Sequence, residues 1–162
     1  MLPSGPGIIV YLDGIQDPGN LGALARSVEA SGCSGLALSP GCAHPNHPRA
    51  LRAAAGSLLR LALAVDVVPE ELDGHLAEEE RPWVALEATT GSSLYEADLP
   101  EDLILALGAE GPGLSARVRE RADLFVHIPM ARNVESLNVT VAGAVVLFEL
   151  QRRKNEAAPR NR

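Results

Sequence analysis

Residues 103–113 read Leu-Ile-Leu-Ala-Leu-Gly-Ala-Glu-Gly-Pro-Gly, an apolar run that leads directly into a loop with three glycines. The aliphatic run 103–107 is typical of a strand buried on both faces. The glycines of 108–113 let backbone N–H groups come close to a ligand. The same pattern also suits a tight strand-to-helix turn, and by itself it leaves both interpretations open. It is neither a P-loop, since no Lys-Ser/Thr follows, nor the dinucleotide fingerprint, whose spacing differs.

Outward from this stretch, strand-like and helix-like segments alternate. The pattern predicts strands over 8–12, 35–38, 61–67, 83–87, 103–107 and 124–128, and helices over 21–30, 48–56, 69–80, 114–121 and 138–153. Such alternation predicts an α/β fold with a mostly parallel sheet covered by helices on both faces. Ligands of such sheets bind at the carboxyl ends of the strands. The loops after Leu12, Leu107 and Ile128 are therefore expected at the site.

Composition predicts one domain with an aliphatic core. The chain has 162 residues, of which 46% are hydrophobic and only 3% aromatic. No apolar run approaches the roughly 20 residues needed to cross a bilayer. The first residues lack the features of a signal peptide. These patterns predict a cytoplasmic protein with no membrane partner, whose two cysteines, Cys33 and Cys42, are free thiols.

Charge is unevenly distributed. The net charge is −7, which argues against a nucleic-acid partner. Residues 152–162 carry five basic residues and one acid, a net of 5 − 1 = +4, so the rest of the chain carries −7 − 4 = −11. Much of that acid lies within 70–80, consistent with a solvated helix face. We expect a domain over 1–155 and a disordered basic tail over 156–162, either frayed in solvent or in contact with phosphate.

The last predicted helix is apolar on nearly all sides. A helix of this kind must be buried all round, and in a small domain a second subunit provides that cover most easily. Ala142, Gly143 and Ala144 would permit close approach of a partner helix. The pattern therefore predicts a homodimer.

Two further loops carry polar residues in suggestive places. Asn20 suits the N-cap of the helix over 21–30, Gly22 permits close backbone approach, and Arg26 lies farther along that helix. An ordinary capped helix with an exposed arginine explains the same residues. In 128–138, hydrogen-bonding side chains lie between an apolar strand and an apolar helix, although Ser136 or Asn138 could simply cap that helix.

No metal site is predicted. Cys33, Cys42, His44 and His47 form a loose thiol and imidazole group, but their spacing fits no tetrahedral zinc motif. The two histidines are expected on a surface loop.

Together the three loops resemble the SpoU/TrmH family of RNA ribose 2′-O-methyltransferases, within the SPOUT superfamily. Each of the family's motifs is weak evidence alone, but all three occur here in the right order. The resemblance covers 8–152. The first, Asn-x-Gly-x-x-x-Arg, corresponds to Asn20, Gly22 and Arg26; the second, Gly-x-Glu-x-x-Gly, to Gly108, Glu110 and Gly113; the third to Ile128-Pro129-Met130 and Ser136-Leu137-Asn138-Val139. Arg52-Ala53-Ala54-Ala55-Gly56 is similar to the family's Arg-Ala-Ser-Ala-Gly, with Ala54 in place of serine.

The resemblance implies a C-terminal deep trefoil knot, which general folding rules would not suggest. It also implies a homodimer with the site near the subunit interface, and S-adenosylmethionine bound in a bent shape by the second and third motifs. The implied cofactor-binding residues are Thr89, Leu107, Gly108, Glu110, Gly111, Ile128, Met130, Ser136 and Leu137.

The implied activity is S-adenosylmethionine-dependent methylation of a ribose 2′-hydroxyl in rRNA or tRNA, without a metal. The implied catalytic residues are Arg26, Asn20, Glu110, Ser136 and Asn138. Arg26 corresponds to the family's proposed base. Because arginine keeps its proton, we expect it instead to stabilise the developing alkoxide and to grip a neighbouring phosphate.

Two other functional classes remain open. A catalytically silent RNA-binding or assembly module could keep this fold, although the retained polar residues argue against it. A small nucleotide-dependent reductase would need a glycine fingerprint after the first strand, which is absent. Many relatives carry an extra N-terminal RNA-binding domain; here the first strand begins at Ile8, so we expect a compact member or a fragment. The Ser-Leu-Asn-Val motif slightly favours a ribosomal target.

Overall fold

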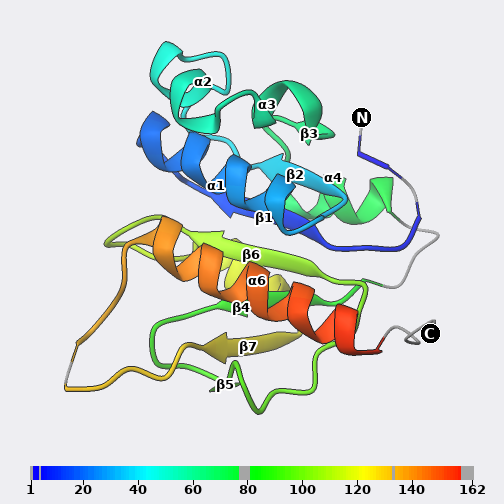
Figure 1. Cartoon of the computed structure of the whole chain (residues 1–162), viewed down its shortest axis with the longest axis vertical. Helices are drawn as coiled ribbons and strands as arrows, with labels where there is room; N and C mark the ends of the chain where they lie inside the picture. Colours follow the sequence, from blue (N-terminus) through cyan, green and yellow to red (C-terminus); the bar gives the residue numbers. More distant parts are fainter. Residues whose placement is uncertain (1, 4, 77–80, 133, 158–162) are drawn as a thin grey trace.

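The computed structural model describes residues 2–3, 5–76, 81–132 and 134–157. Its described strands form one seven-stranded sheet, shown in Figure 1, in which every pairing is parallel and the order is β3-β2-β1-β6-β4-β7-β5. The strands are β1 Ile9–Asp13, β2 Gly35–Leu38, β3 Leu63–Ala64, β4 Trp83–Leu86, β5 Ser92–Ser93, β6 Ile104–Gly108 and β7 Leu124–His127. The predicted α/β class with a mostly parallel sheet is thus confirmed.

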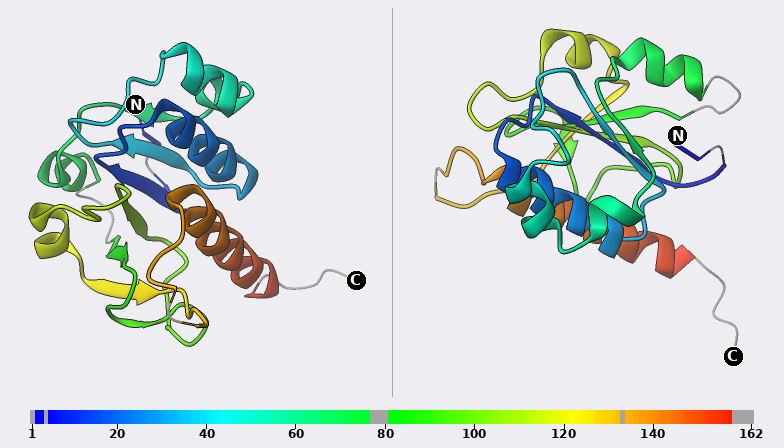
Figure 2. Two further views of the ribbon diagram at one scale, coloured as in Figure 1. Left: turned by 90° about the vertical axis from the view of Figure 1, so that its left-hand side faces the viewer. Right: turned by 90° about the horizontal axis from the view of Figure 1, so that it is seen from above.

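Helices cover both faces of the sheet (Figure 2). One layer contains α1 Pro18–Ala30, α2 Pro48–Ala54, α3 Ser57–Arg60 and α6 Val139–Ala157; the other contains α4 Pro69–His75 and α5 Ala116–Arg121. Side chains alternate between the layers, so Val10 and Leu12 pack with the first and Ile9 and Tyr11 with the second. Burial on both faces explains why the strands read as continuous apolar runs.

Several predicted boundaries need correction. The helix expected over 48–56 breaks after Ala54, because Ala55 and Gly56 have φ of 49° and 90°. The strand expected over 61–67 is limited to Leu63–Ala64, and β5 was not predicted. The helix expected over 69–80 ends at His75, and 77–80 lie outside the described residues.

The last helix is longer than predicted and has two different faces. It continues to Ala157, so Glu156 and Ala157 of the expected tail are helical, while 158–162 lie outside the described residues. The sequence predicted that Gly143 permits close approach of a helix from a second subunit. The structure shows close approach within the chain instead, because a Cβ on Gly143 would lie 2.7 Å from Leu24 Cδ2 of α1. The opposite face leaves Val141 and Phe148 about half exposed, at 51% and 46%. No helix among the described residues is long and apolar enough to cross a membrane.

Gly22 sets the spacing between α1 and α2. A Cβ there would lie 2.3 Å from the carbonyl oxygen of Ala50 and 2.7 Å from Ala53 Cβ. Backbone atoms cannot move aside as a flexible side chain would. We expect Gly22→Ala to lower the free energy of unfolding by about 2–3 kcal/mol in urea denaturation.

The matched control for this prediction is Gly74→Ala. Gly74 also lies in a helix, and nothing is within 4 Å of its Cβ position. That variant should gain up to about 1 kcal/mol from helix propensity. Equal stability of the two variants would show that α1 and α2 are not in tight contact.

Candidate functional site

The functional loops converge at the carboxyl edge of the sheet. In the sheet β6 lies between β1 and β4, and β7 follows β4, so the loops after these strands lie at one edge. Two neighbouring pockets open there, which we call the glycine-loop pocket and the β1-loop pocket. Their volumes are about 440 and 410 Å³. Both are within the range of small-molecule sites, roughly 300–1,000 Å³.

The glycine-loop pocket is lined by most of the predicted cofactor-binding residues. They are Leu107, Gly108, Glu110, Gly111, Ile128, Met130, Ser136 and Leu137, joined by Asn138. Leu86, Leu114, Val139 and Ala142 make much of its wall apolar. Thr89 is exposed and is not among the residues that line either pocket.

The glycine loop folds back on the end of its own strand. A Cβ on Gly108 would lie 2.3 Å from the carbonyl carbon of Gly113 and 2.4 Å from the nitrogen of Leu114. Ala109 forms a bridge to Gly113, and Gly111 and Gly113 have positive φ of 87° and 71°. Glycine is needed for both the contact and the turn. The loop is therefore a tight turn, and this turn forms a wall of the pocket.

Glu110 connects the glycine loop to the start of α6. Its Oε1 accepts hydrogen bonds from the Asn138 side-chain amide and, at 3.3 Å, from the Val139 N–H. Asn138 Oδ1 in turn accepts the Thr140 N–H at 2.9 Å, which caps the helix. Asn138 thus caps the helix, as the sequence allowed, and its side-chain amide also donates to the glycine loop. Val139 N–H is one of the first-turn donors that have no partner within a helix.

Several polar side chains line the β1-loop pocket. Its lining includes Asp13, Gln16, Asp17, Asn20 and Ser115. Ala109, Glu110, Pro112, Gly113, Leu114 and Val139 line both pockets, so the glycine loop is their common wall. Asp13, 8% exposed, accepts the Ser115 N–H at 2.6 Å and joins the loops after β1 and β6.

The N-cap of α1 is Asp17, which corrects the prediction of Asn20. Asp17 Oδ1 accepts the Asn20 N–H at 2.9 Å, and its other oxygen lies 3.2 Å from Arg49 Nη2. The hydrogen bond from Asn20, with smaller help from Arg49, lowers the pKa of Asp17. Asn20 lies in the first turn of α1 and lines the β1-loop pocket.

Arg26 is not brought into either pocket. It lies exposed on α1, and it forms no ion pair with a described residue. Four of the five predicted catalytic residues, Asn20, Glu110, Ser136 and Asn138, line one or both pockets. The fifth, Arg26, therefore lines neither pocket of its own chain.

The sequence interpretation missed Glu87 and Arg119 in the glycine-loop pocket. Arg119 Nη2 donates to Glu87 Oε2 at 3.0 Å. Arg119 Nε lies 2.9 Å from Oε1, but its N–H is not directed at that oxygen, which is buried without a hydrogen-bond partner among the described residues. Glu87 directly follows β4, so the strand-end rule could have found it.

The thiol and imidazole group does not assemble. In the described part of the chain, no three His, Cys, Asp or Glu side chains are grouped to hold a metal. Cys33 and Cys42 are free, and burial raises the pKa of both thiols. His44 and His47 are exposed, as the sequence suggested.

Comparisons with known proteins point to one family. Residues 7–148 match the model of the SpoU rRNA Methylase family. An uncharacterized tRNA/rRNA methyltransferase of Synechocystis sp. is 38% identical over 146 residues, which are 90% of this chain and 53% of the relative. The chain therefore spans about half the length of the curated relatives it matches.

Solved structures agree in fold over nearly the whole chain. The SpoU methyltransferase AviRb from Streptomyces viridochromogenes, crystallised with its cofactor AdoMet, superposes with a TM-score of 0.90 at 28% identity, covering 97% of this chain and 62% of that one. A structure described as an RNA 2′-O ribose methyltransferase has a TM-score of 0.84 at 29% identity, covering 96% and 60%.

The Glu110 contacts predict that this residue orders the start of α6. Glu110→Ala removes the acceptor of Val139 N–H, so amide exchange at Val139 should speed up about three- to tenfold. Glu120→Ala is the control, because it removes the same charge from an exposed residue of α5. Unchanged exchange in Glu110→Ala, measured by NMR, would show that the contact does not hold the helix.

Proposed function

The chain belongs to the SpoU rRNA methylase family, and from this we propose that it binds S-adenosylmethionine in the glycine-loop pocket and methylates a ribose 2′-hydroxyl of RNA. One observation carries the proposal. Two neighbouring pockets share a single wall, and the predicted polar residues Asn20, Glu110, Ser136 and Asn138 line one or both of them. This arrangement suits a transfer between two ligands that bind side by side.

The glycine-loop pocket fits the cofactor. Gly108 lets the loop fold back tightly to form the pocket wall, and the apolar residues around Ile128 and Leu137 can contact an adenine ring. Backbone N–H groups of the loop can donate to polar atoms of a bound nucleoside. The bound cofactor supplies a methyl group already activated by its sulfonium. The protein therefore mainly positions the acceptor and assists loss of its proton.

The β1-loop pocket supplies groups for the acceptor ribose. Asn20 lines it from α1, and Glu110 contributes from the shared wall. Ser136 and Asn138 face the glycine-loop pocket, and Asn138 is held by Glu110. We assign these four residues to orienting the ribose. Positioning of this kind can contribute several orders of magnitude to the rate.

In this proposal, Arg26 acts at the pockets of a partner subunit and not at those of its own chain. It lies outside the pockets of its own chain, while α6 exposes the apolar residues Val141 and Phe148. A homodimer formed through this apolar stripe would cover it and place one subunit's α1 near the other's site. A guanidinium there would stabilise the developing alkoxide and hold a neighbouring phosphate.

The remaining parts of the proposal rest on family resemblance. They are the trefoil knot, the cytoplasmic location and the choice of rRNA or tRNA as target. The two loops that would form the knot are in contact through Glu110 and Asn138. An experimental structure whose chain is not threaded would contradict it.

The proposed function predicts that Arg26→Ala separates binding from transfer. The variant should bind S-adenosylmethionine with unchanged affinity by calorimetry, because Arg26 does not line the cofactor pocket. Methyl transfer should fall by about 100-fold or more, as expected when one donor to a developing oxyanion is removed. The readout is 2′-O-methylnucleoside formation, by mass spectrometry, in RNA from cells that lack the gene. Arg26→Lys, which keeps the charge, is the control.

The outcomes separate the competing functions. Near-normal transfer by Arg26→Ala would remove that residue from the mechanism. Cofactor binding by the wild type without methylation of any RNA would instead favour the silent RNA-binding module. No binding of S-adenosylmethionine would refute the proposal as a whole.

Subunit mixing tests the role of the partner. Arg26→Ala and Gly108→Ala should each be inactive, the second because its Cβ displaces the glycine loop. In a heterodimer of the two, the intact pocket of one subunit faces the intact arginine of the other. An equal mixture should recover about a quarter of wild-type activity, since half the dimers are mixed and each has one working site. A mixture that stays inactive, or a chain that light scattering shows to be monomeric, would contradict this arrangement.

A further inference from the structure

One segment of this acidic chain contains no acid. Residues 30–65 include Arg49, Arg52 and Arg60 and neither Asp nor Glu, so their formal charge is +3. The rest of the chain therefore carries −7 − 3 = −10. An uneven distribution of this kind can create a local positive potential that the net charge conceals.

The structure places most of this charge on one surface beside the β1-loop pocket. His44, His47, Arg49 and Arg52 are all exposed, on α2 and the loop before it, and we call them the α2 surface. Arg49 connects this surface to the pocket, because its guanidinium pairs with Asp17 on the pocket lining while its side chain stays 60% exposed. Arg60 is separate, since Glu29 binds it.

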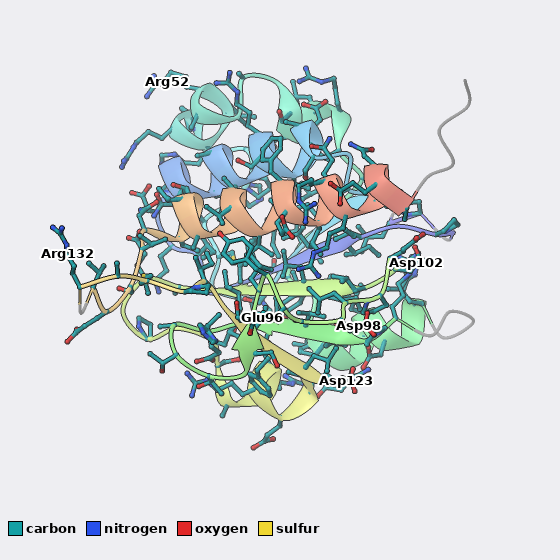
Figure 3. All side chains as sticks on the ribbon, turned by 60° about the horizontal axis from the view of Figure 1, so that its bottom comes forward. Arg52, Glu96, Asp98, Asp102, Asp123 and Arg132 are labelled. Atoms are coloured by element: carbon teal, nitrogen blue, oxygen red, sulfur yellow. The ribbon has the colours of Figure 1, made fainter. Side chains whose placement is uncertain are left out.

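The absence of an ion pair with a described residue distinguishes Arg52 from Arg49 and from several other arginines. Arg117, Arg121 and Arg152 pair with Glu70, Asp73 and Glu149. Arg52 and Arg132 form no ion pair with a described residue. In Figure 3 both lie toward the end of the molecule where α6 begins, whereas Asp102 and Asp123 lie toward the other end. Unpaired arginines at the site edge are available to an anionic ligand.

The position of α2 is firmly set. Gly22 of α1 packs directly against the backbone of Ala50 and Ala54, so α2 is held close to the helix that begins at the β1-loop pocket. His47 Nδ1 accepts the Arg49 N–H at 3.1 Å and caps α2. A surface fixed in this way can bind a strand at a constant distance from the pocket.

We propose that the α2 surface binds backbone phosphates of the substrate RNA next to the nucleotide held in the β1-loop pocket. This inference rests on the proposed function, because it takes RNA as the substrate. Phosphates repeat along any RNA strand, and arginine binds them with several hydrogen bonds. The surface therefore contributes affinity and orientation without reading the base sequence.

The test is the salt dependence of RNA binding. The probe is a mixed-sequence single-stranded RNA of about 20 nucleotides, longer than the ~16 nucleotides that a single-strand-binding fold covers. Each phosphate that a variant no longer neutralises should reduce the slope of log affinity against log salt by about 0.7. Arg52→Ala should show this reduction. Its affinity relative to the wild type should therefore be about threefold lower at ~50 mM salt than at ~200 mM salt.

Two control variants make the result specific. Arg117→Ala changes the net charge equally but removes an arginine already paired with Glu70, on the opposite layer of the molecule. It should leave the slope unchanged. Arg52→Lys should keep the wild-type slope, because it retains the positive charge.

The outcomes keep this inference separate from the proposed function. Wild-type protein that binds the cofactor but no RNA would refute the RNA substrate itself. If the wild-type protein binds RNA and the slopes of log affinity against log salt are equal for Arg52→Ala and Arg117→Ala, only the proposed role of the α2 surface is overturned. Polyglutamate that displaces the RNA probe as strongly as unlabelled RNA does would also overturn this role, since the surface would then favour an acidic protein partner.

Discussion

The wall between the two pockets exists because Gly108 has no side chain. β6 lies between β1 and β4, and the loop after it folds back until backbone atoms of Gly113 and Leu114 occupy the space a Cβ would need. This close return lets one short loop line a pocket on each side. Glu110 then projects from the loop to hold the start of α6. The position of the third motif therefore depends on the second.

Polar contacts between loops hold the site on an otherwise aliphatic scaffold. Asp13 joins the loop after β1 to Ser115, and Asp17 joins α1 to Arg49 of the α2 surface. Each contact connects segments far apart in the chain. Because the acceptors are charged carboxylates, these hydrogen bonds are stronger than those that a neutral side chain would accept. The pockets and the basic surface beside them thus form one connected edge of the molecule.

The net charge conceals an uneven distribution of charge along the chain. A net charge of −7 argues against nucleic acid, yet 30–65 contain no acidic residue and lie partly at the site edge. Many acids elsewhere are paired with arginines, as Glu70 is with Arg117. Binding of a polyanion depends on the potential where it touches, because charges farther than about 8–10 Å are screened at ordinary salt.

Sequence alone was sufficient for the fold class and for much of the pocket. Strands buried on both faces are apolar throughout, so 103–107 could be recognised. The motifs placed Gly108, Ile128 and Leu137 together, and all three line the glycine-loop pocket. Tertiary structure alone decided that Asp17 caps α1, that Gly143 packs on Leu24, that Glu87 lines the pocket and that Arg26 does not. The physical reason is range. Periodicity and loop composition describe neighbours in the chain, whereas these features depend on contacts such as Asp13 with Ser115, which join residues 102 positions apart.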